Sequence, residues 1–543
     1  MRTHTFRPYF LCFVFLLASV GISQADWFTP TPPKAGTTAI ETAGIAPKDS
    51  VLVVSWNLKG QIDLVEYLQK VRAVGLSDPS SRNDLFDEAE QELRRPLPEF
   101  VNYFSGNGFV SVLGSSNEKD KPPVVVAMEL ERPKAFAKWI VEMMGFSKST
   151  KMGDFKVYFE KDDDISLGYN SQWCFFAYKG RGTQSAVDHL SGLGSPIERS
   201  QHFQNAFKEL DYEDSGLALY MDTEKLQSIL LSQSGTGLVT QSLLPKAVWD
   251  YGVGAANFKT ESADLILRLS PVDSNLKTLL ARPGVLTGEM GAKVPDELGA
   301  YVSLDGAWYA RFIDQLGIDS PEFGLLYNIA RQKLNQLGDI EAAFSGPLVF
   351  GTDFVDRLYP GSTPPNSILI ADVADVEEAR LFAQNVSLDK KKKGKASEPH
   401  QTSAGPSDSR IKVDAQEKEF RVTWGPGAEA LINRRPGSSR TTHPLVKDAL
   451  QWAKGELLLL SFFDFSRIAK RWRNIRAVES EDYYFREFVR QFLNHSRLQG
   501  VIAVKSNATG IRYRLRGLSA SPAIPAGFFI GGFSLYRHSR VTP

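Results

Sequence analysis

Three arginines near the end of the sequence, Arg512, Arg514 and Arg516, alternate with Tyr513 and Leu515. Successive side chains of a β-strand point to opposite faces, so this spacing predicts three guanidinium groups on one face of a strand. A guanidinium group can hold phosphate or carboxylate oxygens through two parallel hydrogen bonds. The pattern therefore favours contact with an anionic ligand, and the alternative is a strand face solvated by water.

The same region carries a local excess of positive charge. Between Ser466 and Arg516 there are twelve lysines and arginines against four aspartates and glutamates. The whole chain has 63 basic and 63 acidic residues, so no overall charge attracts nucleic acid. The positions 248 residues earlier hold Asp264, Ile266 and Arg268, which means that the arginine pattern belongs to the second half alone.

Other reactive residue types have a simpler structural interpretation. Cys174 lies among aromatic residues that keep a thiol protonated, so we expect core packing. Gly252–Asn257 resembles a dinucleotide fingerprint but precedes a strand, and Ser116 and Lys119 lie in a polar loop. Asp162–Asp164 lacks the further ligands of a calcium loop.

No catalytic motif of the common kinds is present. The sequence contains no Gly-x-Ser-x-Gly, Walker, His-Glu-x-x-His or Cys-x-x-Cys pattern, and its seven histidines are scattered. We therefore predict no catalytic residue, no cofactor site and no metal site. The alternative is an envelope hydrolase or transferase whose site is assembled from residues distant in sequence.

Four polar residues, Asn57, Asp222, Asp305 and Asp464, recur directly after apolar runs and directly before residues with helical spacing. Gathering them into a carboxylate site is one interpretation. Their position favours another, since an Asp or Asn at a helix start accepts hydrogen bonds from free backbone N–H groups and complements the helix dipole. We expect capping rather than catalysis.

The elements around these residues occur twice in the same order. Ser55 and Ser303 are 248 positions apart, as are Gly252 and Gly500, while Asp222 and Asp464 are 242 apart. A nearly constant offset predicts a tandem duplication, with copies at 45–290 and 291–543. Several predicted strands are adjacent in sequence, so each copy is expected to be an α+β module with a mainly antiparallel sheet and helices.

Three segments are expected to lie outside the two folded copies. Residues 1–25 have a basic start, an apolar stretch and a small-x-small cleavage site, which together predict a secretory signal peptide. Residues 26–44 are rich in Thr, Pro, Gly and Ala and predict an extended arm. Residues 389–417 contain a lysine run and little to bury, which predicts a mobile insertion.

Cysteine usage bears on the compartment. Cleavage would remove Cys12 and leave Cys174 alone, so the mature chain could form no internal disulfide. A secreted eukaryotic protein of this size is usually disulfide-bonded, whereas a periplasmic protein with a large core need not be. We expect a protein that is exported, periplasmic or extracellular, and soluble after signal-peptide cleavage.

The opening unit, Ala46-Pro47-Lys48-Asp49-Ser50 before VLVVSWN, and the stretch SPIERSQHFQNAFKEL before GLALYMD resemble a family of exported bacterial proteins defined only as a domain of unknown function. The resemblance implies an exported α+β protein with strand-Asp-helix repeats and no particular reaction. The leading hypothesis is a non-enzymatic protein that binds or scaffolds an envelope component. The expected partner is an anionic envelope polymer, a lipid surface or another envelope protein.

Overall fold

The structure is a computed structural model. It describes residues 38–57, 106–114, 122–160, 164–178, 180–210, 212, 215–233, 249–259, 262–272, 274–282, 286, 293–295, 298–309, 311–312, 328–329, 332, 336, 338–353, 366–393, 410–414, 418–425, 427–433, 443–464, 499–507 and 509–518. The predicted signal peptide and the predicted boundary at 290–291 lie outside these residues.

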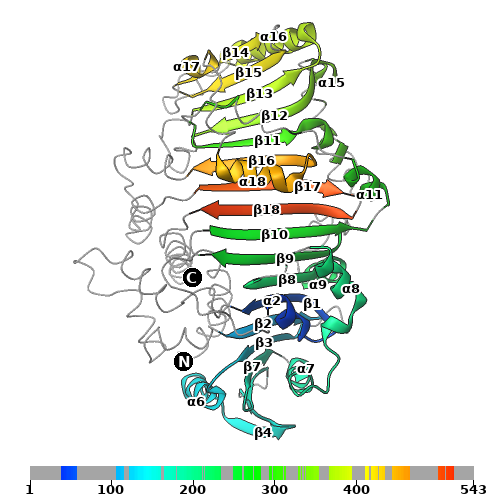
Figure 1. Ribbon diagram of the computed structural model, residues 1–543, viewed down its shortest axis with the longest axis vertical. Helices are drawn as coiled ribbons and strands as arrows, with labels where there is room; N and C mark the ends of the chain where they lie inside the picture. Colours follow the sequence, from blue (N-terminus) through cyan, green and yellow to red (C-terminus); the bar gives the residue numbers. More distant parts are fainter. Residues whose placement is uncertain are drawn as a thin grey trace, which may run out of the picture.

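The described strands form one continuous sheet in which every neighbouring pair is antiparallel (Figure 1). From one edge to the centre, the first half of the chain supplies β4 (Lys148–Met152), β5 (Phe155–Phe159), β6 (Ile165–Tyr169), β7 (Trp173–Tyr178), β3 (Val124–Glu129), β2 (Asn107–Leu113), β1 (Ser50–Asn57), β8 (Leu217–Asp222), β9 (Trp249–Lys259) and β10 (Ser262–Pro271). The fold is therefore α+β, as predicted.

The second half of the chain continues the sheet from β10. Outward from the centre it supplies β18 (Gly510–Leu518), β17 (Gln499–Asn507), β16 (Leu457–Asp464), β11 (Ala300–Asp305), β12 (Phe344–Thr352), β13 (Ser367–Val373), β15 (Glu419–Trp424) and β14 (Arg410–Asp414). β10 and β18 join the halves by pairing directly. The strands of residues 50–271 and those of residues 300–518 thus form one sheet through β10 and β18, the last strand of each half.

Helices cover parts of both faces of the sheet. We call the face that carries α2 (Ala39–Gly44), η1 (Ile197–Arg199), α8 (Gln201–Lys208) and α18 (Pro444–Ala453) the front face. α7 (Gly180–Leu190) and α17 (Ala428–Ile432) also pack on it. The remaining helices are α6 (Pro133–Met144), α9 (Thr223–Gln233), α11 (Ser274–Leu280), α15 (Ile340–Ala343) and α16 (Val376–Lys393). No described helix is long and apolar enough to cross a membrane.

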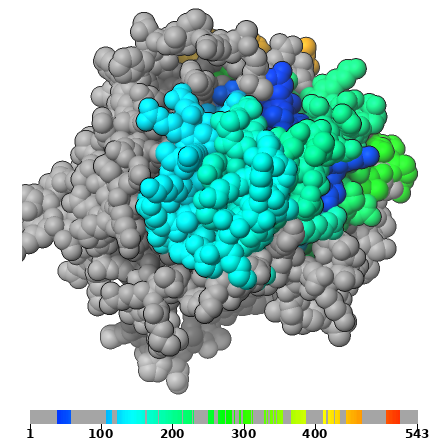
Figure 2. All heavy atoms as spheres, turned by 90° about the horizontal axis from the view of Figure 1, so that it is seen from below, coloured from blue at the N-terminus to red at the C-terminus, as the bar shows by residue number. Residues whose placement is uncertain are grey.

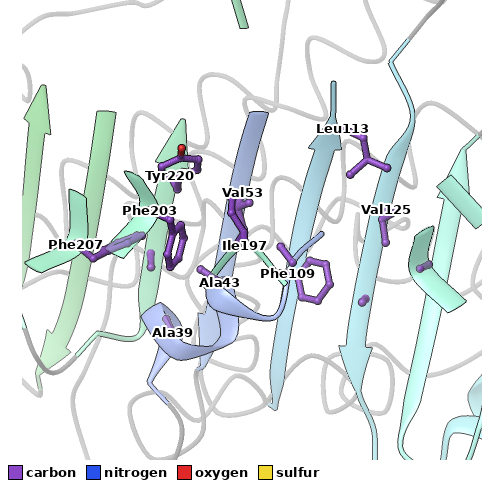
Figure 3. Packing of buried hydrophobic residues seen from close by; sticks show 14 of the residues in the cluster. Ala39, Ala43, Val53, Phe109, Leu113, Val125, Ile197, Phe203, Phe207 and Tyr220 are labelled. Atoms are coloured by element: carbon purple, nitrogen blue, oxygen red, sulfur yellow. The ribbon is translucent and has the colours of Figure 1, made fainter. Parts of the chain in front are cut away.

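The core of the first half lies between the front face and its short helices (Figure 3). Phe203 and Phe207 of α8 and Ile197 of η1 pack over Val53 of β1 and Tyr220 of β8. All five side chains are buried. Helical spacing places the apolar residues of α8 on one side of the helix, and alternation places those of each strand on one face of the sheet, so the two apolar surfaces pack together. This packing fixes α8 against the strands that lead to the centre of the sheet.

The predicted arm 26–44 is corrected at its end, because residues 39–44 form α2 and not an extended segment. The Thr38 side chain accepts a hydrogen bond from the Glu41 N–H, while the Glu41 carboxylate accepts one from the Thr38 N–H. This capping box begins the helix, and the small Ala39 and Ala43 fit fully buried against the sheet. The sequence does not indicate this helix, because six residues show almost no periodicity.

The predicted insertion 389–417 also differs at both ends. Residues 389–393 continue α16, and residues 410–414 form strand β14 at the sheet edge. β14 pairs with β15, placing Ile411 opposite Val422 and Val413 opposite Phe420. Apolar residues at every second position are sufficient for an edge strand, which the surrounding polar composition concealed. Residues 394–409 lie outside the described part.

The second half has separate cores on the two faces. On the front face, α18 and α17 bury apolar residues against β16, β17 and β13. On the opposite face, α11 and the helical residues 306–309, which include Trp308, pack over Leu458 and Val504. On the same face, α15 and α16 pack over Ala371 and Phe420. Viewed from the far end of the first half, the coloured residues on the surface come mainly from that half (Figure 2).

Candidate functional site

The pairing of β10 with β18 places the arginine pattern at the centre of the sheet. The ladder sets three pairs of residues directly opposite each other: Asp264 and Arg516, Ile266 and Arg514, Arg268 and Arg512. Opposite residues of an antiparallel pair lie on the same face. The three arginines therefore share one face, as their spacing predicted. The sequence did not indicate that β10, the matching strand of the first half, pairs with the strand that carries them.

We call this part of the front face, between α8 and α18, the charged seam. It consists of β10 and β18 with the adjoining residues of β9 and β17. No labelled helix lies over β10 and β18 in Figure 1. Arg512, Arg514 and Arg516 are all partly exposed. The seam is thus a strip of sheet whose side chains are ordered by neighbours on both sides and remain in reach of solvent.

One end of the seam, which we call the paired end, contains Arg514, Arg516, Asp264 and Asp448. Arg514 binds Asp264 of the other half in bidentate fashion, with Nε to Oδ1 at 3.0 Å and Nη2 to Oδ2 at 2.7 Å. Asp448 of α18 lies 3.3 Å from Arg514 and 2.7 Å from Arg516. Burial opposes the charge on Arg514, but its bonds to Asp264 and its attraction to both carboxylates raise its pKa. Arg514 thus links the two halves through Asp264, whereas Arg516 binds Asp448 of its own half.

The other end, which we call the cationic end, contains Arg268, Arg512, Lys505 and Glu209. Arg512 is directly opposite Arg268 on one side and Lys505 on the other, so three cations form a row across three strands. Arg268 is 1 % exposed, forms an ion pair with Glu209 and donates to the Thr509 carbonyl at 2.8 Å. Burial, with a contribution from Arg512, lowers the pKa of Arg268 to about 10.

Lys505 lies at the α18 border of the cationic end. Its ammonium group donates to the Trp452 carbonyl at 2.9 Å and lies 4.5 Å from the centre of the Trp452 ring. Burial lowers the pKa of Lys505; Glu456 opposes this, while the positive charges of Arg512, Lys454 and Arg514 add to it. The ammonium group of Lys505 thus lies beside other cations, and the nearby carboxylate of Glu456 does not fully compensate its charge.

The two ends differ in net charge. The paired end has two arginines and two aspartates and is neutral. The cationic end has three cations and one carboxylate, a net charge of +2. Lys454 and Glu456, which also act on Lys505, cancel each other. Among the described residues no carboxylate is paired with Arg512. Its Nε atom is buried without a hydrogen-bond partner, as are the Nε atoms of Arg268 and Arg516.

Sequence reasoning found Arg512, Arg514 and Arg516 but missed the residues that give each a different environment. In the sequence, Arg268 is only the position that matches Arg516, and Glu209, Asp448 and Lys505 belong to no motif. The alternation of Val501, Ala503 and Lys505 along β17 could have placed Lys505 on one face. The ladder between β10 and β18 leaves no local signal, because it joins segments about 250 residues apart.

The sequence also contains no signal for a partly exposed polar chain beside the seam. His202 of α8 lies with Nδ1 3.1 Å from the Tyr220 hydroxyl and Nε2 3.1 Å from Asp250. An acid, a histidine and a hydroxyl in this order suggest nucleophilic chemistry. The Tyr220 side chain, however, is only 3 % exposed, and burial raises its pKa, so the hydroxyl is neither reachable nor readily ionised. The chain fixes α8 against β8 and β9.

The other reactive residues fall in structural positions. Cys174 is fully buried in β7 and burial raises the pKa of its thiol, which confirms core packing. Gly252–Asn257 lies within β9 and begins no helix, as expected. Ser116, Lys119, Asp162 and Asp163 lie outside the described residues. Within the described part, no three His, Cys, Asp or Glu residues are grouped so that they could hold a metal ion.

The strand-ending acids cap helices where their surroundings are described. Asp222 accepts a hydrogen bond from the Lys225 N–H at 3.1 Å, and Asp305 accepts one from the Trp308 N–H at 3.0 Å. Asn57 and Asp464 end β1 and β16, but the residues that follow them are not described. β1 is antiparallel to β8, so Asn57 and Asp222 lie at opposite ends of the strands and form no common carboxylate site.

Comparison with known proteins identifies no family. The chain matches no family model, and no match to a curated protein is found. Among solved structures it is similar to crystal form III of TP0453, at 11 % identity and a TM-score of 0.27, over 47 % of this chain and 91 % of that one. Crystal form IV of TP0453 gives 12 % identity and a TM-score of 0.26, over 42 % and 79 %. These scores are too low to support an argument about fold or function.

Proposed function

We propose that this protein is exported and, without catalysing a reaction, binds an anionic component of the cell envelope at the charged seam. The observation that carries the proposal is the net charge of +2 at the cationic end, where Arg512 is partly exposed and lies between two further cations. Like charges directly opposite each other in a sheet are destabilising. Such a row is therefore more readily explained by a ligand that neutralises it than by a contribution to folding.

Export is supported by the basic and apolar segments of residues 1–25 and by the single cysteine that cleavage would leave. The resemblance to exported bacterial proteins agrees with it. A binding role is favoured over an enzymatic one because the two described groups most like nucleophiles, Cys174 and Tyr220, are both buried.

The proposal includes a tandem duplication of the α+β module. Both halves place their corresponding strands in the same spatial order outward from the β10–β18 pair. A further parallel is a glycine that accommodates a neighbouring side chain. A Cβ atom on Gly252 would lie 2.2 Å from Met221, and one on Gly500 would lie 2.0 Å from Phe463. Gly252 and Gly500 are 248 positions apart and each leaves room for a side chain of the neighbouring strand. This shared packing supports a common origin of the two halves.

The test uses the melting temperature of the mature chain, from Asp26 onward, with peptidoglycan fragments, anionic lipid micelles and acidic polysaccharide at low and high salt. A ligand that binds only the folded state raises the melting temperature, and a ligand at about 100-fold excess over its Kd contributes about 2.7 kcal/mol. We expect a rise that high salt weakens, because exposed charges are screened.

The matched variants are Arg512→Gln and Arg516→Gln. Each removes one arginine from the same face of the same strand, but only Arg516 has a carboxylate partner at 2.7 Å. We expect Arg512→Gln to abolish the ligand-dependent rise and Arg516→Gln to preserve most of it. No rise with any anionic ligand, or a rise that persists in Arg512→Gln, would contradict the proposal.

A further inference from the structure

The charge and the donors of the cationic end favour one class of anion over others. The inference that follows rests on the proposed function of the charged seam. We propose that its ligand is a phosphate group carrying two negative charges, held by Arg512 and Lys505. The argument uses the charge of the site, the arrangement of its donors and the roles already filled by its other residues. Each of these distinguishes a phosphate monoester from a carboxylate or a phosphodiester.

Charge is the first criterion. The cationic end has a net charge of +2, whereas the paired end a few residues along β18 is neutral. A phosphate monoester carries a charge of about −1.5 to −2 at pH 7 and would neutralise the cationic end. A carboxylate or a phosphodiester carries one charge and would leave a cation uncompensated on a partly buried surface.

The arrangement of donors is the second criterion. Arg512 and Lys505 are directly opposite each other on β18 and β17, and opposite residues have Cα atoms about 4.5–5.5 Å apart. A guanidinium group can hold two oxygens of one group, and an ammonium group can hold a third. A phosphate monoester offers three acceptor oxygens.

Arg268 has a different role at this site. It is fully buried and already occupied by Glu209, by the Tyr251 hydroxyl at 3.3 Å and by the Thr509 carbonyl. It therefore contributes its charge from below without contacting the ligand. The carboxylates that act on this end are Glu209, directly after α8, and Glu456, beside α18. The cations are Arg268, Lys454, Lys505, Arg512 and Arg514.

A phosphate monoester occurs in some lipid headgroups and in phosphorylated sugars. The proposed site recognises the monoester group that the two share. Calorimetric titration of the mature chain with glycerol 3-phosphate, sulfate and acetate, at pH 8 and pH 5, tests that group. Vesicles containing phosphatidic acid then report whether the site accepts a monoester on a membrane. Vesicles containing phosphatidylglycerol, whose headgroup is a phosphodiester, are the control for binding to an anionic membrane that carries no monoester.

We expect glycerol 3-phosphate to bind at least tenfold more tightly than acetate at pH 8. Its second proton dissociates near pH 6, so its affinity should fall about tenfold at pH 5. Sulfate keeps both charges at the two pH values, so its affinity should change less than twofold. This pair separates the titration of the ligand from any titration of the protein.

The variants locate the site. Arg512→Gln should weaken glycerol 3-phosphate binding at least tenfold, and Arg512→Lys, which keeps the charge and loses the paired donors, about threefold. Arg516→Gln removes the same charge from the paired end and should change the affinity less than twofold. The melting temperature of each variant without ligand establishes that it is folded.

Two results would overturn the inference: acetate binding as tightly as glycerol 3-phosphate, or equal losses in Arg512→Gln and Arg516→Gln. If acetate and acidic polysaccharide bind equally well and depend on Arg512, the phosphate assignment fails while the proposed function stands. If no anion binds and no envelope polymer changes the melting temperature, both fail. Binding to glycerol 3-phosphate but not to phosphatidic acid vesicles assigns the group to a non-lipid source.

Discussion

The paired end and the cationic end of the charged seam use the same residue type on the same face of the same strand, with different partners. Arg514 meets Asp264 and Asp448, while Arg512 meets Arg268 and Lys505. Arg512 and Arg516 are four positions apart, about 14 Å along a strand. The difference teaches that an arginine pattern in a sequence does not define a function, because the residues on neighbouring strands decide whether each arginine stabilises the fold or remains available to a ligand.

The largest expected difference between the two ends is in stability. Arg514→Met should lower the free energy of unfolding by about 2–3 kcal/mol, because it leaves Asp264 as a partly buried charge without its bidentate partner. Urea denaturation measures this. The double variant Asp264→Asn/Arg514→Met should lose less than the two single variants combined. Additive losses would mean that the pair does not join the halves.

Asp448→Asn should have a smaller effect. It removes the carboxylate 2.7 Å from Arg516, while Arg514 keeps its two bonds to Asp264. Asp448 is 34 % exposed, so solvent screening limits the expected loss to about 1 kcal/mol. Urea denaturation at low and high salt would show a loss that salt reduces. A loss as large as that of Arg514→Met would mean that Asp448, and not Asp264, dominates the paired end.

Arg512→Gln should change stability in the opposite direction. It removes a cation that lies between two others, so the protein without ligand should be unchanged or more stable by up to about 0.5 kcal/mol. The same denaturation measurement applies. A loss above about 1 kcal/mol, the usual range for a surface charge pair, would show that Arg512 has a structural partner and would remove the distinction between the ends.

The smallest effect concerns pH. Because burial and the neighbouring cations lower the pKa of Lys505 in the folded state, the unfolded chain holds this proton more tightly as the pH approaches 10.5. Stability rises with pH wherever the unfolded state binds more protons. The stability of the natural protein relative to Lys505→Met should therefore increase just below pH 10.5. A relative decrease would mean that Lys505 is stabilised in its charged form.

Much of the fold could be predicted from local patterns. Apolar runs predict the four strands that end in Asn57, Asp222, Asp305 and Asp464. The runs at 252–258 and 265–269, separated by polar residues 259–264, predict the hairpin that β9 and β10 form. The connection is shorter than expected, since the strands reach Lys259 and Ser262. The hydrogen bonds between strands are made by the backbone, so a strand can continue through polar residues. The hydrophobic pattern therefore predicts where the strands lie but not where they end.

The site could be predicted only in part. Alternation placed Arg512, Arg514 and Arg516 on one face because that rule depends on a single strand. Their separate roles depend on Asp264, Asp448 and Lys505, which come from three other elements. An unaligned single sequence contains no record of which strands become neighbours when the two halves join, so the division of the seam into two ends could not be read from it.

The antiparallel pairing of β10 with β18 is centred on Ile266 and Arg514. If a strand like β18 paired in this way with an identical copy of itself, two-fold symmetry would set an arginine opposite an arginine at all three positions. A chain that carries both strands is free of that restriction, because a substitution in one strand is not repeated in the other. Asp264 can then complement Arg514 while Arg512 keeps its excess charge. Covalent linkage thus allows an asymmetric junction that a symmetric dimer could not evolve.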